Sequence, residues 1–457
     1  METQQRFLRV LGRKDVLALA FGAMVGWGWV IMSNTWILRG GSIGAVAAFA
    51  GGGLIILIVA LLYAELAAAM PRAGGEHFYS LKALGWTGSF VCTWALIFIY
   101  VSVCCFEAVA LASVFDYIDI NVKHVYLWTI AGYDVYLGWA LIGIVASAVI
   151  TTINILGVKL SAIFQTTVTL LVLVSGLCLL TGATLHGSSD NIQPYFAAGG
   201  VGILSVLVMV PFFFVGFDVI PQAAEEINLP FRDIGSIIIV SVGITVLWYC
   251  LVILAVALLL DAPSLSTSKL ATADANAIAW GDIGATLLIV GGIAGILTSW
   301  NAFVIGGSRA IFAMAGDDML PSGLEKLHHS YRTPFMAIAL IGLLSCIAPI
   351  FGRQALVWFV NAGSFGLVIA WLLVSISFLR LRKLHPEMER PFKLPAGTLA
   401  GWAGVVSCLM LTCLYLPGSP AALAREEWLI VLAWTFLGLI FYIQGVTRQK
   451  RKVTNHG

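Results

Sequence analysis

Long apolar runs recur along the whole chain, and they constrain its fold more than any other feature. Many reach the ~20 residues that a helix needs to cross ~30 Å of hydrocarbon. They are too long for the roughly 10-residue alternating segments of a membrane barrel. Only 11% of the 457 residues are charged and 60% are hydrophobic, whereas a soluble domain carries about 25% charged residues. The sequence therefore predicts an all-α, polytopic membrane protein.

The polar breaks between apolar stretches predict twelve transmembrane helices. The predicted spans are 15–38, 43–69, 87–118, 135–155, 160–182, 200–222, 235–260, 285–313, 334–351, 354–379, 399–417 and 427–446. We divide the chain into 1–182, with the N-terminus and spans one to five, 183–379, with spans six to ten, and 380–457, with the last two spans and a tail.

The distribution of basic residues predicts the orientation in the membrane. If both termini are cytoplasmic, 20 of the 25 Lys and Arg residues lie inside. The other five are Arg39, Lys123, Lys269, Arg353 and Arg425. Cytoplasmic loops carry such an excess of Lys and Arg, so we expect cytoplasmic termini.

Charge, cysteine and histidine usage exclude several classes of function. A net charge of +2 provides no basic face for a nucleic acid. All eight cysteines lie in apolar runs, which favours buried thiols over disulfides or metal ligands. All seven histidines are expected in polar connections or the tail, and neither a GxSxG nor an HExxH motif is present. We expect no cofactor, no metal site and no enzymatic activity.

Two spans are interrupted at mid-depth by glycine and proline. The first contains GAMVGWGWV (22–30) and the sixth contains PFFFVGFDVIP (211–221). Glycine tolerates non-helical dihedrals and proline lacks an amide donor, so both segments are predicted to be broken helices. Bare backbone at membrane depth must line a cavity or be covered by protein. A packing role for the glycines is the alternative, but the 190 residues between Gly26 and Gly216 suggest an inverted repeat with a site between its halves.

Several motifs together carry a resemblance to a known family. They are GWGWV in the first span, YAELAAAMPRAGGEHFY after the second, NILGVKLSA in the fifth, GFDVIPQAAEEINLPFRDI in the sixth and SWNAFVIGGSRAIFAMAGDDMLP in the eighth. Across its first ten spans the chain resembles the amino acid, polyamine and organocation transporter family. The resemblance implies a five-plus-five inverted repeat with two further helices, and secondary active transport by alternating access.

The first break supplies four candidate substrate-binding residues, Val25, Gly26, Trp27 and Gly28. Unpaired amides at the end of a half-helix favour an anion such as a carboxylate. Members of the family usually have a small residue where this chain has Trp27. The indole could narrow the pocket or hold an ammonium group by cation–π attraction, or it could be a lipid-facing or packing side chain.

Glu107 is an acidic residue well inside the apolar third span. A carboxylate at this depth costs about 2.5–3.5 kcal/mol even on insertion scales, so it needs a partner or a proton. We expect Glu107 to bind a cargo ammonium or to exchange a proton, with Cys104 on the same helix face. The alternative is a protonated carboxyl that hydrogen-bonds to a neighbouring helix.

The sixth span contributes a run of aromatic residues and a glycine. In the family an aromatic side chain covers the cargo here, and Phe212 matches that position best. We expect Phe212, Phe213 and Gly216 to line the site, although aromatic runs are equally common in ordinary cores.

Acidic residues follow the sixth-span glycine. Asp218 is a candidate for coupling or gating, and with Glu225 and Glu226 it is expected to form cytoplasmic ion pairs with Arg72 or Lys82. The alternative for Glu225 and Glu226 is a solvated acidic loop.

The coupling ion is left open between proton and sodium. Some family members place a lysine in the fifth span where this chain has Val172. Thr298 and Ser299 could offer hydroxyls to a sodium ion near the first-span carbonyls, or bond their own helix. Asn301 could contact the cargo or bond between helices.

These features predict a plasma-membrane permease for a small amino acid or an amine such as a polyamine. Its partners would be the small-molecule cargo, a proton or sodium ion, and the lipid bilayer, and the protein would be a monomer or a homodimer. The alternative is a membrane sensor that binds an amino acid or amine without transporting it.

Overall fold

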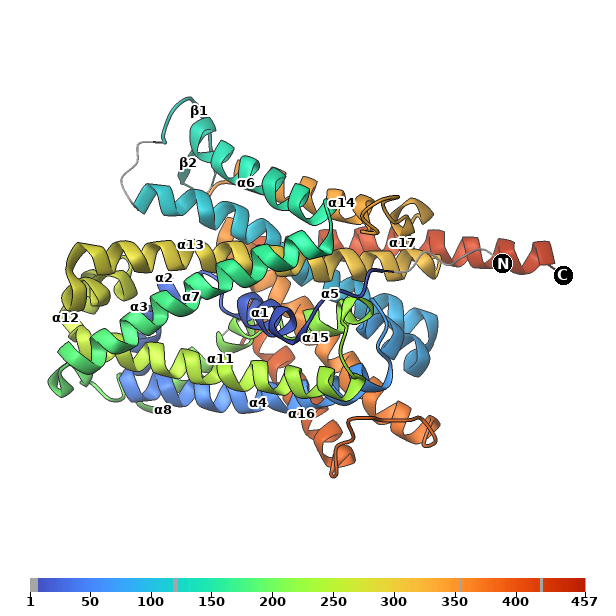
Figure 1. Ribbon diagram of the computed structural model, residues 1–457, viewed down its shortest axis with the longest axis horizontal. Coiled ribbons are helices and arrows are strands. Elements are labelled where there is room, and N and C mark those ends of the chain that lie inside the picture. The colour runs from blue at the N-terminus through green and yellow to red at the C-terminus, as the bar shows by residue number, and fades with distance from the viewer. Residues whose placement is uncertain (1–6, 118–121, 131, 354, 420–421, 457) are drawn as a thin grey trace.

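The protein is an elongated bundle of long helices, as the computed structural model shows (Figure 1). The structure describes residues 7–117, 122–130, 132–353, 355–419 and 422–456. The predicted all-α membrane architecture is confirmed.

Ten helices in the described part of the chain are long and apolar enough to cross a membrane. They are Arg13–Ile31 (α1 Arg13–Met24 and α2 Gly28–Ile31), α4 (Ser42–Ala69), α5 (Glu76–Tyr117), α6 (Leu137–Ile155), α7 (Val158–His186), α11 (Phe231–Leu259), α13 (Ala271–Gly316), α15 (Ala355–Leu384), α16 (Gly397–Tyr415) and α17 (Arg425–His456). Each coincides with a predicted span.

The other two predicted spans are shorter or discontinuous, so the total of twelve stays a prediction. The ninth is α14 (Phe335–Ile347) followed by η4 (Ala348–Phe351), and the sixth is α8 (Gly199–Leu207), α9 (Val210–Phe213) and α10 (Val219–Gln222). The remaining helical segments are α3 (Ser33–Gly40), η1 (Ser189–Ile192), η2 (Ala224–Glu226), α12 (Ala262–Thr267) and η3 (Ser322–Glu325).

Two helices extend further toward their N-termini than the predicted spans. α5 and α13 contain Gly85 (φ 76°) and Gly281 (φ 66°), where the backbone leaves the helical region. Glycine adopts positive φ without steric cost. Each predicted span begins just after its glycine, and a further helical segment precedes it.

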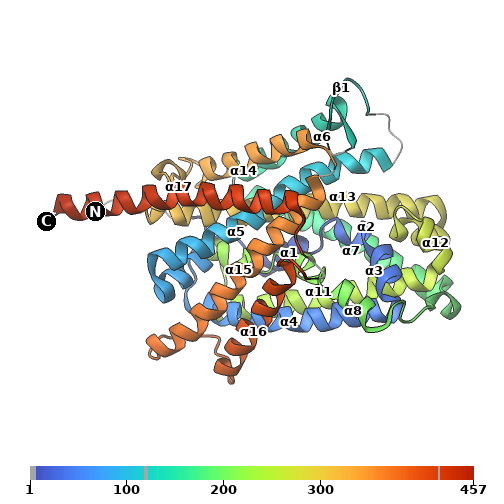
Figure 2. The ribbon, with the colours of Figure 1, turned by 180° about the vertical axis from the view of Figure 1, so that it is seen from behind.

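A short antiparallel hairpin connects α5 to α6 and was not predicted. Its strands are β1 (Tyr126–Ile130) and β2 (Tyr133–Tyr136). The hairpin lies at one end of the bundle and the C-terminal end of α17 at the other, in both views (Figures 1 and 2).

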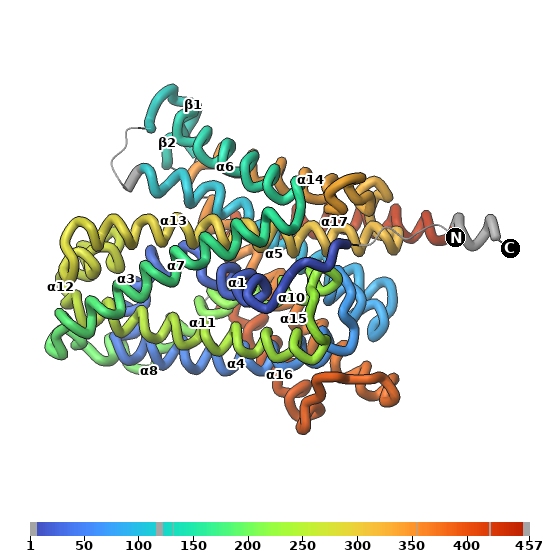
Figure 3. The backbone as a smooth tube through the Cα atoms, viewed as in Figure 1, coloured from blue at the N-terminus to red at the C-terminus, as the bar shows by residue number. Residues whose placement is uncertain are grey.

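Burial separates central from peripheral helices. In an apolar 18-residue stretch of α5, 89% is buried inside the protein, whereas in the corresponding stretch of α17 only 17% is buried. α5 is therefore a central helix, whereas α17 presents most of its surface to the surroundings. α1 and α10, which flank the two breaks, lie side by side in the middle of the molecule (Figure 3).

Candidate functional site

The first break frees fewer backbone amides than the sequence suggested. The Val25 amide donates to the Phe21 carbonyl at 2.9 Å, so it is not available to a ligand. The hydrogen bonds of the described residues give no backbone acceptor to the amides of Gly26, Trp27 and Gly28. These three amides remain the candidates for contact with an anionic group.

The two breaks touch each other through glycines. Gly216 has φ 131°, and a Cβ atom on it would lie 2.6 Å from the Ala23 side chain at the end of α1. A Cβ atom on Gly28 would lie 2.2 Å from Cε1 of Phe213. Real Cβ atoms do not approach other atoms so closely, so both contacts require glycine.

Glu107 lies directly beside the first break. Its side chain is buried, and a Cβ atom on Gly26 would lie 3.0 Å from Glu107 Oε1. Ser299 of α13 interacts with the same carboxyl group. Oε2 has no hydrogen-bond partner, and no ion pair in the described part of the chain includes Glu107. The geometry leaves one carboxyl oxygen free to meet a cargo donor or to carry a proton.

A small cavity of about 20 Å³ lies where the two breaks meet α5, α11 and α13. Seven predicted site residues line it: Gly26, Trp27, Gly28, Glu107, Phe212, Phe213 and Ser299. A cavity of this size holds about one water molecule. The cavity is thus too small for an amino acid in this structure, and such a cargo would enter only after the surrounding side chains move.

Tyr249 is a cavity residue that the sequence analysis missed. It belongs to α11, and its hydroxyl donates to the Met24 carbonyl at 2.8 Å. The bond satisfies a carbonyl that the break in α1 leaves without its helical partner. A tyrosine inside an otherwise apolar span was the available signal, since a buried tyrosine hydroxyl usually has a polar partner.

The sixth-span aromatic residues divide between two environments. Phe212 makes edge contacts with Phe106 at 5.9 Å and with Phe213 at 5.3 Å between ring centroids. Phe213 also packs on Trp36 at 4.9 Å and on Tyr249 at 5.9 Å. Phe212 therefore adjoins the third span, whereas Phe213 belongs to a larger aromatic cluster.

Trp27 combines two of the roles considered for it. Its indole lines the cavity and is only 4% exposed, so it does not face lipid. A Cβ atom on Gly292 would lie 2.3 Å from its Cζ3 atom. The ring is packed into α13 at this glycine and narrows the cavity from that side.

The remaining predicted site residues lie outside the cavity. Asn301 accepts hydrogen bonds at Oδ1 from Asn154 at 2.8 Å and from Ser161 at 2.9 Å, and it donates to Gln165 at 2.8 Å. The Asn301 amide is thus engaged between helices α6, α7 and α13. Cys104 is fully buried in α5 but is not among the residues that line the cavity.

The first-span carbonyls near Thr298 already accept hydrogen bonds from side chains. Thr298 donates to the Gly22 carbonyl at 3.0 Å, and Gln165 and Thr169 donate to the Ala18 carbonyl at 3.1 and 3.3 Å. A sodium ion would have to displace these donors to bind the same oxygens.

The acidic residues after the sixth-span break are placed differently from the expectation. Glu226 pairs with Arg309 of α13 at 2.7 Å, and both side chains are 1% exposed. Asp218 is buried and accepts the Gly216 amide at 3.0 Å. No ion pair within the described residues joins Asp218, Glu225 or Glu226 to Arg72 or Lys82. The expected pairing is wrong for this conformation because Arg309 neutralises Glu226 from a neighbouring helix.

One histidine also departs from the expectation. His77 is fully buried in the first turn of α5 and not in a polar connection. Its Nε2 lies 2.7 Å from Asp317 Oδ2, and its Nδ1 lies 3.2 Å from the Thr93 hydroxyl. The polar segment before Gly85 is folded into the protein as a helix, which the sequence did not reveal.

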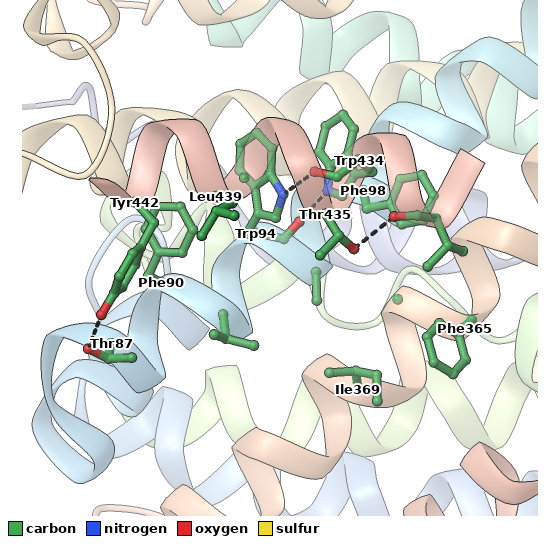
Figure 4. A pocket seen from close by; sticks show the side chains of 15 residues that line it. Thr87, Phe90, Trp94, Phe98, Phe365, Ile369, Trp434, Thr435, Leu439 and Tyr442 are labelled. Carbon is green, nitrogen blue, oxygen red and sulfur yellow. Dashed lines mark hydrogen bonds between the residues drawn. The ribbon is translucent and has the colours of Figure 1, made fainter. Parts of the chain in front are cut away.

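A larger hollow of about 360 Å³ lies between α5, α15 and α17, away from the breaks (Figure 4). Trp94 and Trp434 belong to its lining and stack on each other at 4.5 Å between ring centroids. Each indole donates to the other's backbone carbonyl, at 3.0 and 3.1 Å. The lining is almost entirely apolar and carries no ionisable carboxyl group, so this hollow is not suited to a charged cargo.

The family model described as amino acid permease matches residues 11–441. The branched-chain amino acid permease BcaP of Bacillus subtilis (strain 168) is 26% identical over 449 residues, which cover 95% of this chain and 92% of the relative. The methylthioribose transporter of the same organism is 28% identical over 454 residues, with the same coverage. Cationic amino acid transporter 4 of Mus musculus is 26% identical over 418 residues, 87% of this chain and 64% of the relative. All three relatives are named as permeases or transporters, which gives no support to the sensor alternative.

Proposed function

The chain belongs to the amino acid permease family, and we propose that it carries a small amino acid or an amine across the plasma membrane by alternating access. The family membership establishes a transporter, and the central cavity between the two broken spans is the proposed cargo site. The choice of cargo rests on the position of Glu107. A buried carboxyl beside the break, with one oxygen unpartnered, is suited to an ammonium group.

The named cargoes of the relatives do not decide between cargo classes. The curated relatives are a branched-chain amino acid permease, a methylthioribose transporter and a cationic amino acid transporter. We infer a cargo with an exposed amine from the Glu107 carboxyl. A carboxylate on the cargo, where present, would meet the amides of Gly26, Trp27 and Gly28.

Proton coupling or exchange is the proposed energy source. The Thr298 hydroxyl and the Gln165 amide donate to first-span carbonyls, so these oxygens have partners without a sodium ion. Glu107 is the proposed proton carrier at the cargo site, because a carboxyl that alternates between closed and open surroundings changes its proton affinity.

Uptake into proteoliposomes tests the proposal. We expect purified protein to accumulate an amine or a small amino acid under an inward proton gradient or against preloaded cargo, without a requirement for sodium. Binding without accumulation under any gradient would contradict transport.

Glu107→Gln tests the role of the carboxyl. We expect uptake to fall at least tenfold and its pH dependence to flatten, because the amide neither carries the negative charge nor exchanges a proton. Glu426→Gln, at an exposed position at the start of α17, is the matched control and should behave as wild type. Unchanged uptake with an unchanged pH profile would assign Glu107 to structure alone.

A further inference from the structure

A second group of buried acidic side chains lies where α5 begins and the sixth span resumes after its break. Glu76 is the first residue of α5 and Asp218 directly precedes α10, and both are fully buried. Gln222 donates from Nε2 to Glu76 Oε2, and the Gly216 amide donates to Asp218 Oδ1 at 3.0 Å. Within the part of the chain that the structure describes, Glu76 Oε1 and Asp218 Oδ2 have no hydrogen-bond partner.

The backbone holds the two acidic segments against each other. The Gly74 amide donates to the Gln222 carbonyl at 3.1 Å. A Cβ atom on Gly75 would lie 2.8 Å from Cβ of Pro221. The turn that leads into Glu76 is therefore in direct contact with α10, and Glu76 and Asp218 interact electrostatically.

Two tyrosine hydroxyls, one from α4 and one from further along α5, adjoin the acidic pair. Tyr63 of α4 and Tyr100 of α5 are fully buried, and among the described residues neither hydroxyl has a hydrogen-bond partner. Tyr63 interacts with both carboxyl groups, and Tyr100 interacts most strongly with Asp218. The Phe217 ring packs on Tyr63 at 5.2 Å between centroids. Unpartnered donors thus surround unpartnered carboxyl oxygens in a site without access to water.

No ion pair among the described residues joins a cation to Glu76 or Asp218. The titratable groups that face Glu76 and Asp218 from the surrounding elements are Tyr63 of α4 and Tyr79, Cys92 and Tyr100 of α5. None of them carries a positive charge. Two ionised carboxylates without a counter-charge are strongly disfavoured in a buried site. We do not assign a metal ion as the counter-charge of the two carboxylates, since the described residues contain no group of three His, Cys, Asp or Glu side chains that could hold one.

We propose that Glu76 and Asp218 form a proton-binding pair, separate from Glu107, in which one of the two carboxyl groups carries a proton. A hydronium ion supplies the proton: one of its O–H bonds breaks and leaves a water molecule, and a new O–H bond forms on the carboxylate, which becomes a carboxylic acid. The proton site stands by itself, whereas its part in coupling rests on the proposed transport function. Asp218 belongs to the broken span and Glu76 to α5, so movement of one past the other would open the pair to water and release the proton.

Infrared difference spectroscopy of the purified full-length protein tests the pair directly. Spectra are recorded between neutral and alkaline pH in a Glu107→Gln background, which removes the contribution of the central site. We expect a carboxylic-acid C=O band at neutral pH that disappears at alkaline pH. The band should be lost in Glu76→Gln and in Asp218→Asn and kept in Glu389→Gln, a control at an exposed position. A band that persists unchanged in both variants would overturn the proposal, and this readout needs no transported cargo.

Uptake measurements test the consequence for coupling. In a wild-type background, Glu76→Gln mimics the protonated state, so we expect its cargo uptake to vary several-fold less with pH than that of the wild type. Glu76→Asp keeps the carboxyl group and should restore the pH dependence, which a purely structural role would not do. An identical pH profile for Glu76→Gln and the wild type would contradict coupling through this pair. Failure of every variant and of the wild type to transport would contradict the proposed function instead, and would leave the infrared result to decide the proton site.

Discussion

Gly28 lies where the two broken spans touch, and the contact leaves no room for a side chain. A Cβ atom at this position would lie 2.2 Å from the Phe213 ring. We expect Gly28→Ala to displace that ring, to destabilise the protein by about 1–3 kcal/mol through overpacking and to reduce uptake. Thermal unfolding in detergent and uptake into liposomes are the measurements.

Gly51→Ala is the matched control for this prediction. Gly51 lies in α4, and a Cβ atom on it would meet no atom within 4 Å. Alanine in a helix is favoured over glycine by about 0.5–1 kcal/mol, so this variant should be as stable as the wild type or more so. Equal stability and uptake of the two variants would show that Phe213 moves freely and that the closed packing is not required.

The residues that the sequence identified differ from those that it missed in one physical respect. Glu107 stands alone in an apolar run, and its cost of burial is visible without a structure. Tyr249 and Glu76 acquire their roles from segments far away in the chain, the Met24 carbonyl and the Gln222 amide. Such partners depend on how helices pack, which no local pattern reveals.

The helices themselves were largely predictable, because their hydrophobic length and their breaks are local properties. Glycine and proline in the first and sixth spans predicted interruptions, and α1 ends at Met24 while α10 begins after Gly216. The segments ahead of Gly85 and Gly281 were not predicted as helix. Polar residues such as Glu76, His77 and Asn276 are buried there by packing against other helices, and a hydropathy pattern does not contain that information.

The connection from the sixth span to α11 is tied to α13 by a buried ion pair. Glu226 Oε1 accepts from Nη2 of Arg309 at 2.7 Å and from Nε at 3.2 Å. The backbone carbonyl of Glu226 accepts the amides of Val10 and Leu11 at 3.0 and 2.9 Å. One residue therefore connects the N-terminal segment, the broken span and α13.

Removal of one partner should weaken this connection strongly. We expect Glu226→Leu to cost about 3–5 kcal/mol, because it leaves the buried Arg309 charge uncompensated. The neighbouring Glu225→Leu removes a half-buried carboxyl and should cost much less. The measurement is thermal unfolding of Glu226→Leu, of Arg309→Met and of the double variant that carries both changes. Together with the wild type these proteins form a double-mutant cycle. A single Glu226 variant as stable as the wild type would show that the pair contributes nothing to the fold.

Helices from both halves of the chain meet at the cavity between the two breaks. α1 and α10 lie side by side (Figure 3), and the cavity between the breaks is also lined from α5, α11 and α13. These elements come from residues on both sides of the proposed division at 182 and 183. The arrangement supports the proposal of an inverted repeat, in which equivalent breaks 190 residues apart face a shared site. The repeat, and the separation of 380–457 from it, remain predictions.

Orientation across the membrane is the prediction that concerns the entire chain. The hairpin between α5 and α6 and the C-terminal end of α17 lie at opposite ends of the bundle (Figures 1 and 2). Because Lys and Arg are enriched in cytoplasmic loops, the hairpin should face outward and the loop before α16 inward.

Single cysteines introduced by Asp134→Cys and by Glu389→Cys, with the eight native cysteines replaced, report on these two ends. In intact cells a membrane-impermeant thiol reagent should label Asp134→Cys, and it should label Glu389→Cys only after permeabilisation. The reverse pattern would invert the topology.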